Sequence, residues 1–251
     1  MLPGHPATFG YMLAFRKRAG KKLLLMHGIY DGPEAQAWLD RLRAVTGGRL
    51  RFNAFQPYKT LERMIMEDHQ IDPDVPKGAK EDKQSGYIDK ILTLADWKEI
   101  VEYIRTADTI PNFVVIEPYG GRIAEIPASD AAFVHRSVHM DFYVDVWWVA
   151  AAEKAAAVAW LDGFMALMRP HFNGMTYQNY PRATFKDYSL NYWGIDVYTE
   201  LCAIKKKYDP GDFFTFPQAI GRWPGFQPSQ GICDPKLTAA IQDRNIVVEG
   251  P

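Results

Sequence analysis

One segment, Met140 to Trp148, alternates sharply between polar or aromatic and aliphatic side chains. Successive side chains of a strand point to opposite faces, so this pattern predicts a strand with one wholly apolar face. The other face would carry Asp141, Tyr143, Asp145 and Trp147. Tyrosine and tryptophan rings are costly to leave in water, which suggests that something covers this face. The alternative is an edge strand whose polar face simply meets solvent.

Other hydrophobic patterns predict helices between further strands. Apolar residues recur at helical spacing over 34–45, 93–107, 150–168 and 199–207, and residues 55–68 indicate a strand end followed by a helix. Residues 21–30 predict a buried strand, residues 112–117 and 122–126 predict a hairpin, and residues 71–82 predict a solvated loop. This order of predicted helices and strands contains no glycine-rich connection of the kind that joins parallel strands through a helix. The pattern therefore predicts an α+β fold, a large antiparallel sheet with helices packed on one face.

Composition and charge narrow the class of protein. The 251 residues include 29 Lys and Arg against 30 Asp and Glu, a balance that argues against a nucleic-acid partner. In the first 22 residues the basic positions follow the apolar ones, the reverse of a secretory signal, and no later run is long enough for a membrane helix. Two cysteines, Cys202 and Cys233, offer little for a disulfide framework. We therefore expect a cytoplasmic protein with no membrane or nucleic-acid partner.

Common catalytic and cofactor motifs are missing from the sequence. It contains no G-x-G-x-x-G or G-x-x-x-x-G-K-[ST] nucleotide loop and no G-x-S-x-G nucleophile turn. His135 and His139 are four residues apart, but on an extended segment they would be separated by roughly 13 Å at ~3.3 Å per residue. We interpret them as one histidine at a polar edge and one exposed histidine, and predict no metal site.

Two groups of residues could carry chemistry. A carboxylate under an aromatic cover has its pKa raised by desolvation, which makes Asp141 and Asp145, beside Tyr143, candidate proton acceptors. The segment from Tyr177 to Pro181, followed by Tyr188, Tyr192 and Trp193, is dense in phenol and amide groups. Such a set suits a flat conjugated ligand, although an aromatic core segment would have the same composition.

Segments along most of the chain carry a family resemblance. Near the C-terminus they are Tyr177-Gln178-Asn179-Tyr180, Trp193-Gly194, Leu201, Ile204-Lys205, Lys207-Tyr208-Asp209-Pro210, Phe213, Phe216-Pro217-Gln218 and Ile220. Upstream they are Lys83, Ser85-Gly86-Tyr87, Glu117 to Ile123, Ile126-Pro127, Ala132-Phe133 and His135-Arg136. In this order they resemble the substrate-binding domain and C-terminal signature of the berberine bridge enzyme-like family of FAD-linked oxidases.

The resemblance implies a large antiparallel sheet backed by helices, whose open face lies over the flavin ring. It implies that Tyr180 helps to deprotonate the substrate, that Tyr177 and Asn179 lie near the flavin, and that Asp141, Tyr143 and Asp145 point inward. Members of the family also carry an N-terminal FAD domain of similar size. Neither its glycine-rich loop nor an attachment segment is found here, so FAD is expected only if a separate FAD domain is present, and otherwise no cofactor.

We therefore predict a substrate-binding domain over residues 1–220, with the berberine-bridge-like segment at about 175–220, and a C-terminal extension over 221–251. The first hypothesis is the substrate-binding and catalytic part of an FAD-linked oxidoreductase acting on an aromatic, polyketide-like or alkaloid-like small molecule. The second is a flavin-independent cyclase or isomerase, and the third a non-catalytic small-molecule-binding or partner protein. An uncovered aromatic face predicts an FAD-domain chain, a homodimer or a covering tail that includes Trp223 to Phe226.

Overall fold

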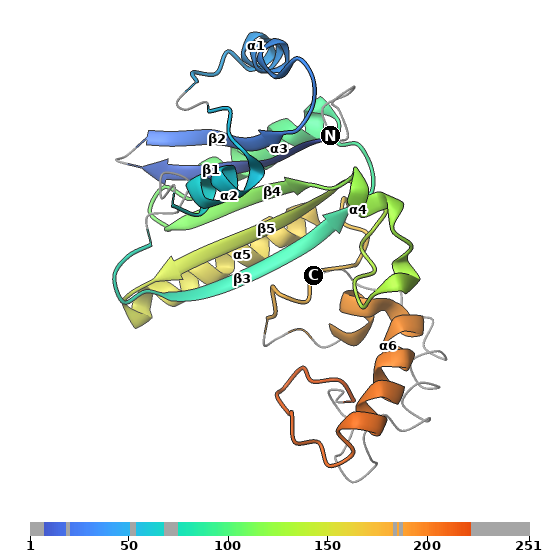
Figure 1. Cartoon of the computed structure of the whole chain (residues 1–251). Coiled ribbons are helices and arrows are strands. Elements are labelled where there is room, and N and C mark those ends of the chain that lie inside the picture. The colour runs from blue at the N-terminus through green and yellow to red at the C-terminus, as the bar shows by residue number, and fades with distance from the viewer. Residues whose placement is uncertain are drawn as a thin grey trace.

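The computed structural model describes residues 8–18, 21–50, 54–67, 75–182, 185 and 188–221. Its centre is an antiparallel sheet of five strands in the order β2-β1-β4-β5-β3 (Figure 1). The strands are β1 (Phe9–Arg18), β2 (Lys21–Tyr30), β3 (Lys80–Ile88), β4 (Asn112–Pro118) and β5 (Met140–Trp148). The predicted α+β class is confirmed.

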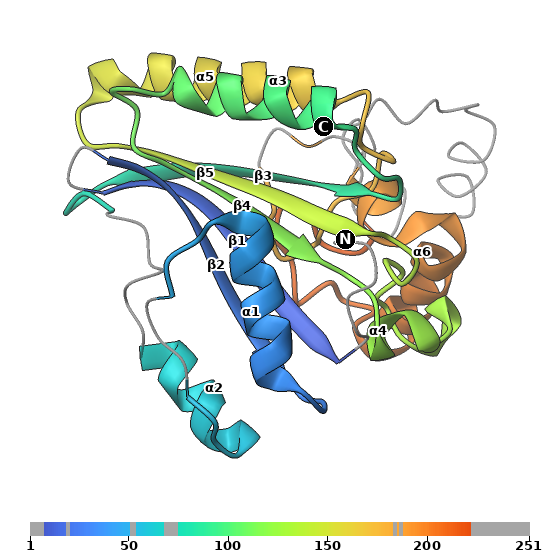
Figure 2. The same ribbon diagram turned by 90° about the horizontal axis from the view of Figure 1, so that it is seen from above.

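Two helices, α3 (Leu94–Arg105) and α5 (Lys154–Met168), cover one face of the sheet (Figure 2). The N-terminus of α3 is fixed by a capping box, in which the Thr93 hydroxyl accepts from the Asp96 amide and the Asp96 carboxylate accepts from the Thr93 amide. Helix α5 ends at Met168, and its C-cap Arg169 directly precedes Pro170, a residue that favours termination of the preceding helix.

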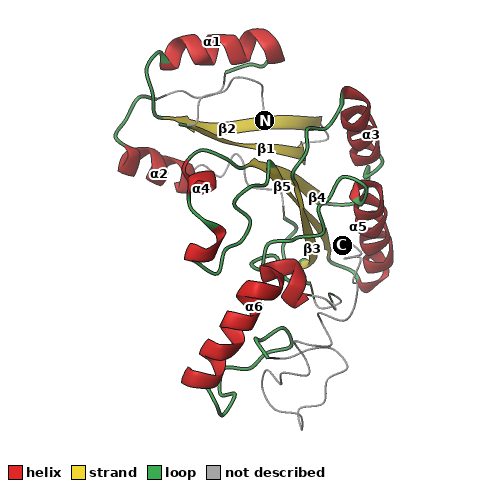
Figure 3. Cartoon of the chain, turned by 90° about the vertical axis from the view of Figure 1, so that its right-hand side faces the viewer, coloured by secondary structure: helices red, strands yellow, loops and turns green. Residues whose placement is uncertain are grey.

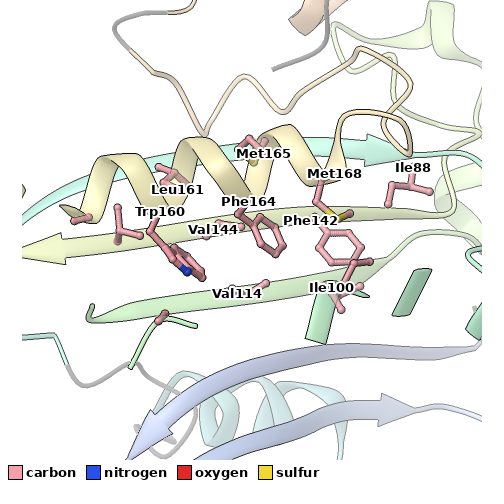
Figure 4. Close-up of a cluster of buried hydrophobic side chains, with 14 of the residues drawn as sticks. Ile88, Ile100, Val114, Phe142, Val144, Trp160, Leu161, Phe164, Met165 and Met168 are labelled. Atoms are coloured by element: carbon pink, nitrogen blue, oxygen red, sulfur yellow. The ribbon is translucent and has the colours of Figure 1, made fainter. Parts of the chain in front are cut away.

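The main core lies between these helices and the apolar face of β5. Phe142, Val144 and Val146 are fully buried there, as the alternation predicted. Figure 4 shows the α5 side chains Trp160, Leu161, Phe164, Met165 and Met168 together with Val144, Phe142 and Val114. Each such burial stabilises the fold by about 1.5–3 kcal/mol. Because this face of β5 is fixed in the core, the polar positions of β5 must face the other way.

The remaining helices lie away from this layer. Helices α1 (Ala35–Thr46) and α2 (Tyr58–Glu67) are on the opposite side of the sheet from α3 and α5, and α6 (Tyr188–Tyr208) lies beyond the β3 edge (Figure 3). Helix α6 is interrupted at Gly194, whose φ of 65° is accessible to glycine at little cost. Short helical turns, α4 (Arg122–Glu125), η1 (Ala128–Asp130) and η2 (Ala151–Glu153), complete the described elements.

Several sequence predictions are wrong in detail. Residues 122–126 do not pair with β4, because Gly120 and Gly121 adopt positive φ values and the chain enters α4 instead. The strand at 21–30 is correctly placed but lies at the sheet edge, where Leu24 is 58% exposed. Strand β1 was not predicted, and β3 begins inside the predicted loop of residues 71–82. Helix α6 begins well before residue 199.

Three further expectations concern the chain termini, the membrane and the cysteines. Residues 222–251, including the predicted cover from Trp223 to Phe226, lie outside the described residues. Among the helices that the structure describes, none is long and apolar enough to span a membrane. Cys202 is buried and disulfide-bonded, contrary to the expectation for these cysteines, and the other cysteine of the sequence, Cys233, lies outside the described residues.

Candidate functional site

The face of the sheet opposite α3 and α5 carries a group of polar side chains, which we call the site face. Strand β5 is an interior strand between β4 and β3, so its polar residues are flanked by side chains of both neighbours. Three cross-strand rows result: Tyr87, Asp141 and Glu117; Ser85, Tyr143 and Val115; Lys83, Asp145 and Phe113. The interior position of β5 rules out the alternative of an edge strand meeting solvent.

The segment that contains Tyr177 and Tyr180 is fixed beside the free edge of β3. The Tyr87 amide donates to the Met175 carbonyl at 3.1 Å, and the Asn173 amide donates to the Tyr87 carbonyl at 2.9 Å. The Thr176 hydroxyl donates to the Ser85 carbonyl at 2.9 Å. These contacts bring Tyr180 against Tyr143, with ring centroids 4.7 Å apart.

Five rings form a continuous series on this side of the molecule, which we call the aromatic arc. Its members, in order of contact, are Tyr119, Phe133, Tyr177, Tyr180 and Tyr143. Successive ring centroids are 6.3, 6.0, 5.2 and 4.7 Å apart. All five side chains are half-buried. A set of partly accessible rings with phenol groups suits a flat, conjugated ligand.

Two carboxyl groups lie within the site face. Asp141 is 0% exposed, and neither of its oxygens has a hydrogen-bond partner among the described residues. Burial raises its pKa well above the ordinary value, and the nearby Glu117 carboxylate raises it further. Burial raises the pKa of Asp145 to about 7, although Lys83, with Nζ 3.0 Å from Asp145 Oδ1, opposes this shift. The protonated form of Asp141 is thus favoured by its surroundings, whereas Asp145 changes charge close to neutral pH.

The phenols of the site face are held in their protonated form. Burial is the main cause that raises the pKa of Tyr143 and Tyr180, and Glu117 adds to both shifts. Each of these tyrosines needs a nearby cation to act as a base at neutral pH. The Lys83 ammonium lies 5.2 Å from the Tyr143 ring centroid and 4.9 Å from that of Tyr180.

The structure therefore brings most of the candidate residues together. Asp141, Tyr143 and Asp145 share one face of β5, and Tyr180 contacts Tyr143 from the neighbouring segment. Tyr177 contacts Tyr180 and accepts a hydrogen bond from the exposed Asn179 amide at 2.8 Å. These two residues lie at the solvent-accessible side of the group.

Sequence reasoning missed Lys83 and Glu117 as site residues. Both occur within the segments that resemble the family, and this resemblance was the signal that could have identified them as site residues. Their importance arises from strand register, because Lys83 lies opposite Asp145 and Glu117 lies opposite Asp141. Register across separate strands cannot be derived from spacing along one strand.

The histidine interpretation needs correction. His135 is buried and stacks on Tyr87, with ring centroids 4.2 Å apart, and His139 is half-buried, so neither is exposed. Burial lowers the pKa of His135 to about 4, so its ring is neutral at physiological pH. Among the described residues, no group of three or more His, Cys, Asp or Glu is arranged to hold a metal ion.

Comparison with known proteins gives related sequences over part of the chain. Residues 176–221 match the family model described as Berberine and berberine like. The uncharacterized FAD-linked oxidoreductase YvdP of Bacillus subtilis is 33% identical over 115 residues, which cover 45% of this chain and 24% of that protein. Berberine bridge enzyme-like 9 of Arabidopsis thaliana is 26% identical over 159 residues, which cover 55% of this chain and 29% of that protein.

Solved structures share the fold. The crystal structure of aclacinomycin oxidoreductase has a TM-score of 0.67 at 19% identity, covering 85% of this chain and 47% of that one. Wild-type BBE-like 1 of Physcomitrella patens has a TM-score of 0.68 at 18% identity, covering 86% of this chain and 47% of that one. This chain thus spans about half the length of these structures and less than a third of the two sequence relatives. The resemblance to berberine bridge enzyme-like FAD-linked oxidoreductases is confirmed over that part.

Proposed function

We propose that this chain, a partial relative of the berberine bridge enzyme-like FAD-linked oxidoreductases, is the substrate-binding and catalytic part of such an enzyme. The observation that carries the proposal is the contact between Tyr143 on the polar face of β5 and Tyr180 of the neighbouring segment, at 4.7 Å between ring centroids. Two half-buried phenols are thereby available to a molecule bound at one place, with the buried Asp145 carboxyl adjacent to them. A set of convergent acid and base groups beside an aromatic surface is typical of an active site.

The substrate class follows from the aromatic arc. Its five rings offer apolar contact area, and the four tyrosines among them add phenol groups, which favours a flat aromatic or polyketide-like or alkaloid-like molecule. Among the relatives whose names state a substrate, two support this class, whereas a chitooligosaccharide oxidase of Gibberella zeae, 28% identical over 141 residues, is named for a sugar. One is a monolignol oxidoreductase of Arabidopsis thaliana, 23% identical over 150 residues, and the other is aclacinomycin oxidoreductase.

The site also has features that fit a flavin. The five half-buried rings of the aromatic arc form a surface on which a flat conjugated ring system can pack. Tyr177 and Asn179, partly or fully accessible and bonded to each other, would hold the flavin at the open side of the arc. When bound, FAD supplies the acceptor for a hydride from a substrate C–H group. A separate chain or another part of a longer protein would contribute the FAD domain.

The residues of this chain would position the substrate and accept its proton. The rings of the arc exclude water from one side of the substrate, which strengthens electrostatic interactions there. Tyr180, once ionised, would accept the proton of a substrate hydroxyl at Oη, as the family resemblance implies, and Tyr143 lies against the Tyr180 ring. The pKa of Asp145 is about 7, so this carboxyl changes charge close to neutral pH.

The test combines a spectrum with a reaction. The protein is purified together with any chain that copurifies, and its visible absorbance is examined for the two bands of oxidised flavin. Aromatic alcohols such as a monolignol are then added without oxygen, and bleaching of these bands is followed. Bleaching that Tyr180→Phe slows strongly supports the proposal. Flavin that binds but is reduced equally fast by the Tyr180→Phe variant contradicts the assigned role.

A second candidate function, a flavin-independent cyclase or isomerase, is favoured by one observation. The site face holds two acids with raised pKa values, Asp141 and Asp145, on either side of Tyr143 along β5, and such groups could perform acid and base chemistry without a cofactor. Turnover of a hydroxylated aromatic or polyketide-like probe by colourless protein, abolished in Asp145→Asn, would establish this function in place of oxidation.

A further inference from the structure

A largely buried arginine lies two residues after Tyr180, at the edge of the sheet. The Arg182 side chain is 13% exposed, and it forms a two-pronged ion pair with Asp82, with Nε 3.0 Å from Oδ1 and Nη2 2.8 Å from Oδ2. Its Nη1 donates to Asp162 Oδ1 at 3.0 Å. Asp82 lies on β3 and Asp162 lies on α5, so one side chain joins the segment of Tyr180 to both elements.

The main chain of Arg182 is held as well. Gln218 Nε2 donates to the Arg182 carbonyl at 2.7 Å, and the Tyr192 hydroxyl donates to Gln218 Oε1 at 2.9 Å. Both Gln218 and Tyr192 are buried, and Tyr192 belongs to α6. Arg182 is therefore fixed from three sides, by β3, by α5 and, through Gln218, by α6.

The same segment has a second anchor at its upstream end. The buried Thr176 hydroxyl donates to the Ser85 carbonyl at 2.9 Å. Ser85 and Asp82 are three residues apart on β3, which corresponds to roughly 10 Å. The chain from Thr176 to Arg182 could extend over roughly 20 Å. It is thus longer than the stretch of β3 between its two anchors.

A turn takes up this extra length and carries the Tyr180 ring. The Tyr180 amide donates to the Tyr177 carbonyl at 2.9 Å. The ring of Tyr180 contacts that of Tyr143 at 4.7 Å and that of Tyr177 at 5.2 Å between centroids. Contacts between rings permit a range of offsets and tilts, so they fix a hydroxyl less narrowly than hydrogen bonds do. The position of the phenol therefore depends on the anchors at the two ends of the turn.

We propose that Arg182 is a positioning residue, which holds the Tyr180 phenol in place through its ion pairs with β3 and α5. This rests on the proposed function, in which Tyr180 meets a substrate hydroxyl at one place. Asp82 lies opposite Val146 of the helix-covered core, so the ion pair belongs to the helix side of β3. Arg182 acts on the reaction through the chain, because it ties the segment of the phenol to the rigid core.

The experiment follows Tyr180 by ¹⁹F NMR in the full chain, without flavin or substrate. A singly fluorinated tyrosine is incorporated at position 180 alone. Arg182→Met should move its resonance toward the position seen in urea, and Asp82→Asn should move it in the same direction. Asp162→Asn should have a smaller effect, because the Asp162 side chain is 54% exposed and its charge is screened. Arg182→Lys keeps the charge but lacks the planar fork, so it should restore part of the shift.

Two controls separate positioning from a general loss of stability. Arg105→Met removes an exposed ion pair with Glu102 on α3 and should leave the Tyr180 resonance unchanged. A second sample carries the fluorinated tyrosine at position 103, where the Tyr103 hydroxyl donates to the Trp160 carbonyl at 3.1 Å beside the main core. Its resonance should be the same in the native protein and in the Arg182→Met variant.

The inference is overturned if Arg182→Met moves the Tyr180 resonance no more than Arg105→Met does, or if it moves the Tyr103 resonance equally far. Should Arg182→Met fail to fold, Arg182→Lys and Asp82→Asn decide by the same criteria, because both nearly preserve the size of the side chain.

Failure of the proposed function would be a separate result. In the flavin-loaded enzyme, Arg182→Met should lower kcat by about 10²-fold, because a reacting group displaced by about 1 Å loses this much. KM should change less, because the other rings of the aromatic arc still bind the substrate. A native protein that turned over no substrate with any flavin would refute the proposed function, whereas the NMR shifts would still show whether Arg182 positions Tyr180.

Discussion

The two faces of the sheet are built on the same strands but differ in the chemistry of their side chains. On the helix-covered face, Phe142, Val144 and Val146 pack against α5 with no polar side chain between them. On the site face, the alternate residues of the same strand include a buried acid without a hydrogen-bond partner in the described part of the chain, a half-buried phenol and an acid paired with a lysine. Stability is concentrated on the first face. The second face retains groups that are costly to bury, which is typical of a functional site.

The largest loss of stability should come from the helix-covered face. Phe164 of α5 is fully buried in the main core, so Phe164→Ala removes its packing and leaves a cavity. We expect the free energy of unfolding to fall by about 3–5 kcal/mol, measured by urea denaturation. Val45→Ala, at a position that is 77% exposed, should change it by less than about 0.5 kcal/mol. A similar loss in both variants would contradict this division between the faces.

The largest loss of activity should come from the site face. Tyr180→Phe removes only the phenolic oxygen, so kcat should fall by about 10²–10⁴-fold if this group transfers the proton. The free energy of unfolding should barely change, because the half-buried ring and its contact with Tyr143 remain. Tyr208→Phe, an exposed tyrosine on α6, is the control and should keep full activity. A reduction of less than threefold for Tyr180→Phe would remove it from the proposed role.

Replacing the unpartnered acid should increase stability. Asp141→Asn removes a group that cannot ionise in the folded state without a large desolvation cost. Because the pKa of Asp141 is raised in the folded state, this group contributes to the stability of the fold at low pH. That contribution is lost as the pH rises through the pKa that Asp141 has in the folded protein. The variant should therefore gain about 1–3 kcal/mol over the native protein at pH 8, and less at pH 4. Unfolding curves at both pH values measure the difference, and an equal gain at both would contradict a buried titrating acid.

A substitution at Asp145 should alter the pH dependence of the free energy of unfolding over a narrower pH range. The pKa of Asp145 is raised to about 7 in the folded protein, above the ordinary value of a carboxyl. The native protein should therefore lose stability between about pH 4 and pH 7 as the unfolded state releases this proton first. Asp145→Asn should flatten that part of the profile. A profile with unchanged slope would show that Lys83 keeps this carboxyl ionised throughout.

The smallest effect should come from a helix cap. Thr93→Ala removes the hydroxyl that accepts from the Asp96 amide at the start of α3. We expect a loss of about 1 kcal/mol in the free energy of unfolding, with unchanged activity, because α3 lies on the face away from the site. Thr93→Ser preserves the hydroxyl and should restore the stability. If Thr93→Ala also changed turnover, the two faces would be coupled through the sheet.

Local sequence determined the elements whose signals are contained within a few residues. The period-two pattern of 140–148 predicted β5 and its two faces, and helical spacing over 93–107 predicted α3, because both patterns depend on neighbouring residues. The same pattern brought Asp141, Tyr143 and Asp145 to one face. Their relation to Tyr180 came from the family resemblance, and the contact itself became visible only in the fold.

The tertiary structure decided which strands are neighbours and therefore which charges meet. Lys83 and Glu117 are distant in sequence from β5, and only the order β4-β5-β3 and its register place them opposite Asp145 and Asp141. Burial, which raises the pKa of both acids, likewise depends on all the elements that cover the face. The amino-acid sequence specifies this arrangement, but a pattern along one segment shows only its own period, whereas pairing and desolvation depend on segments far apart in the chain.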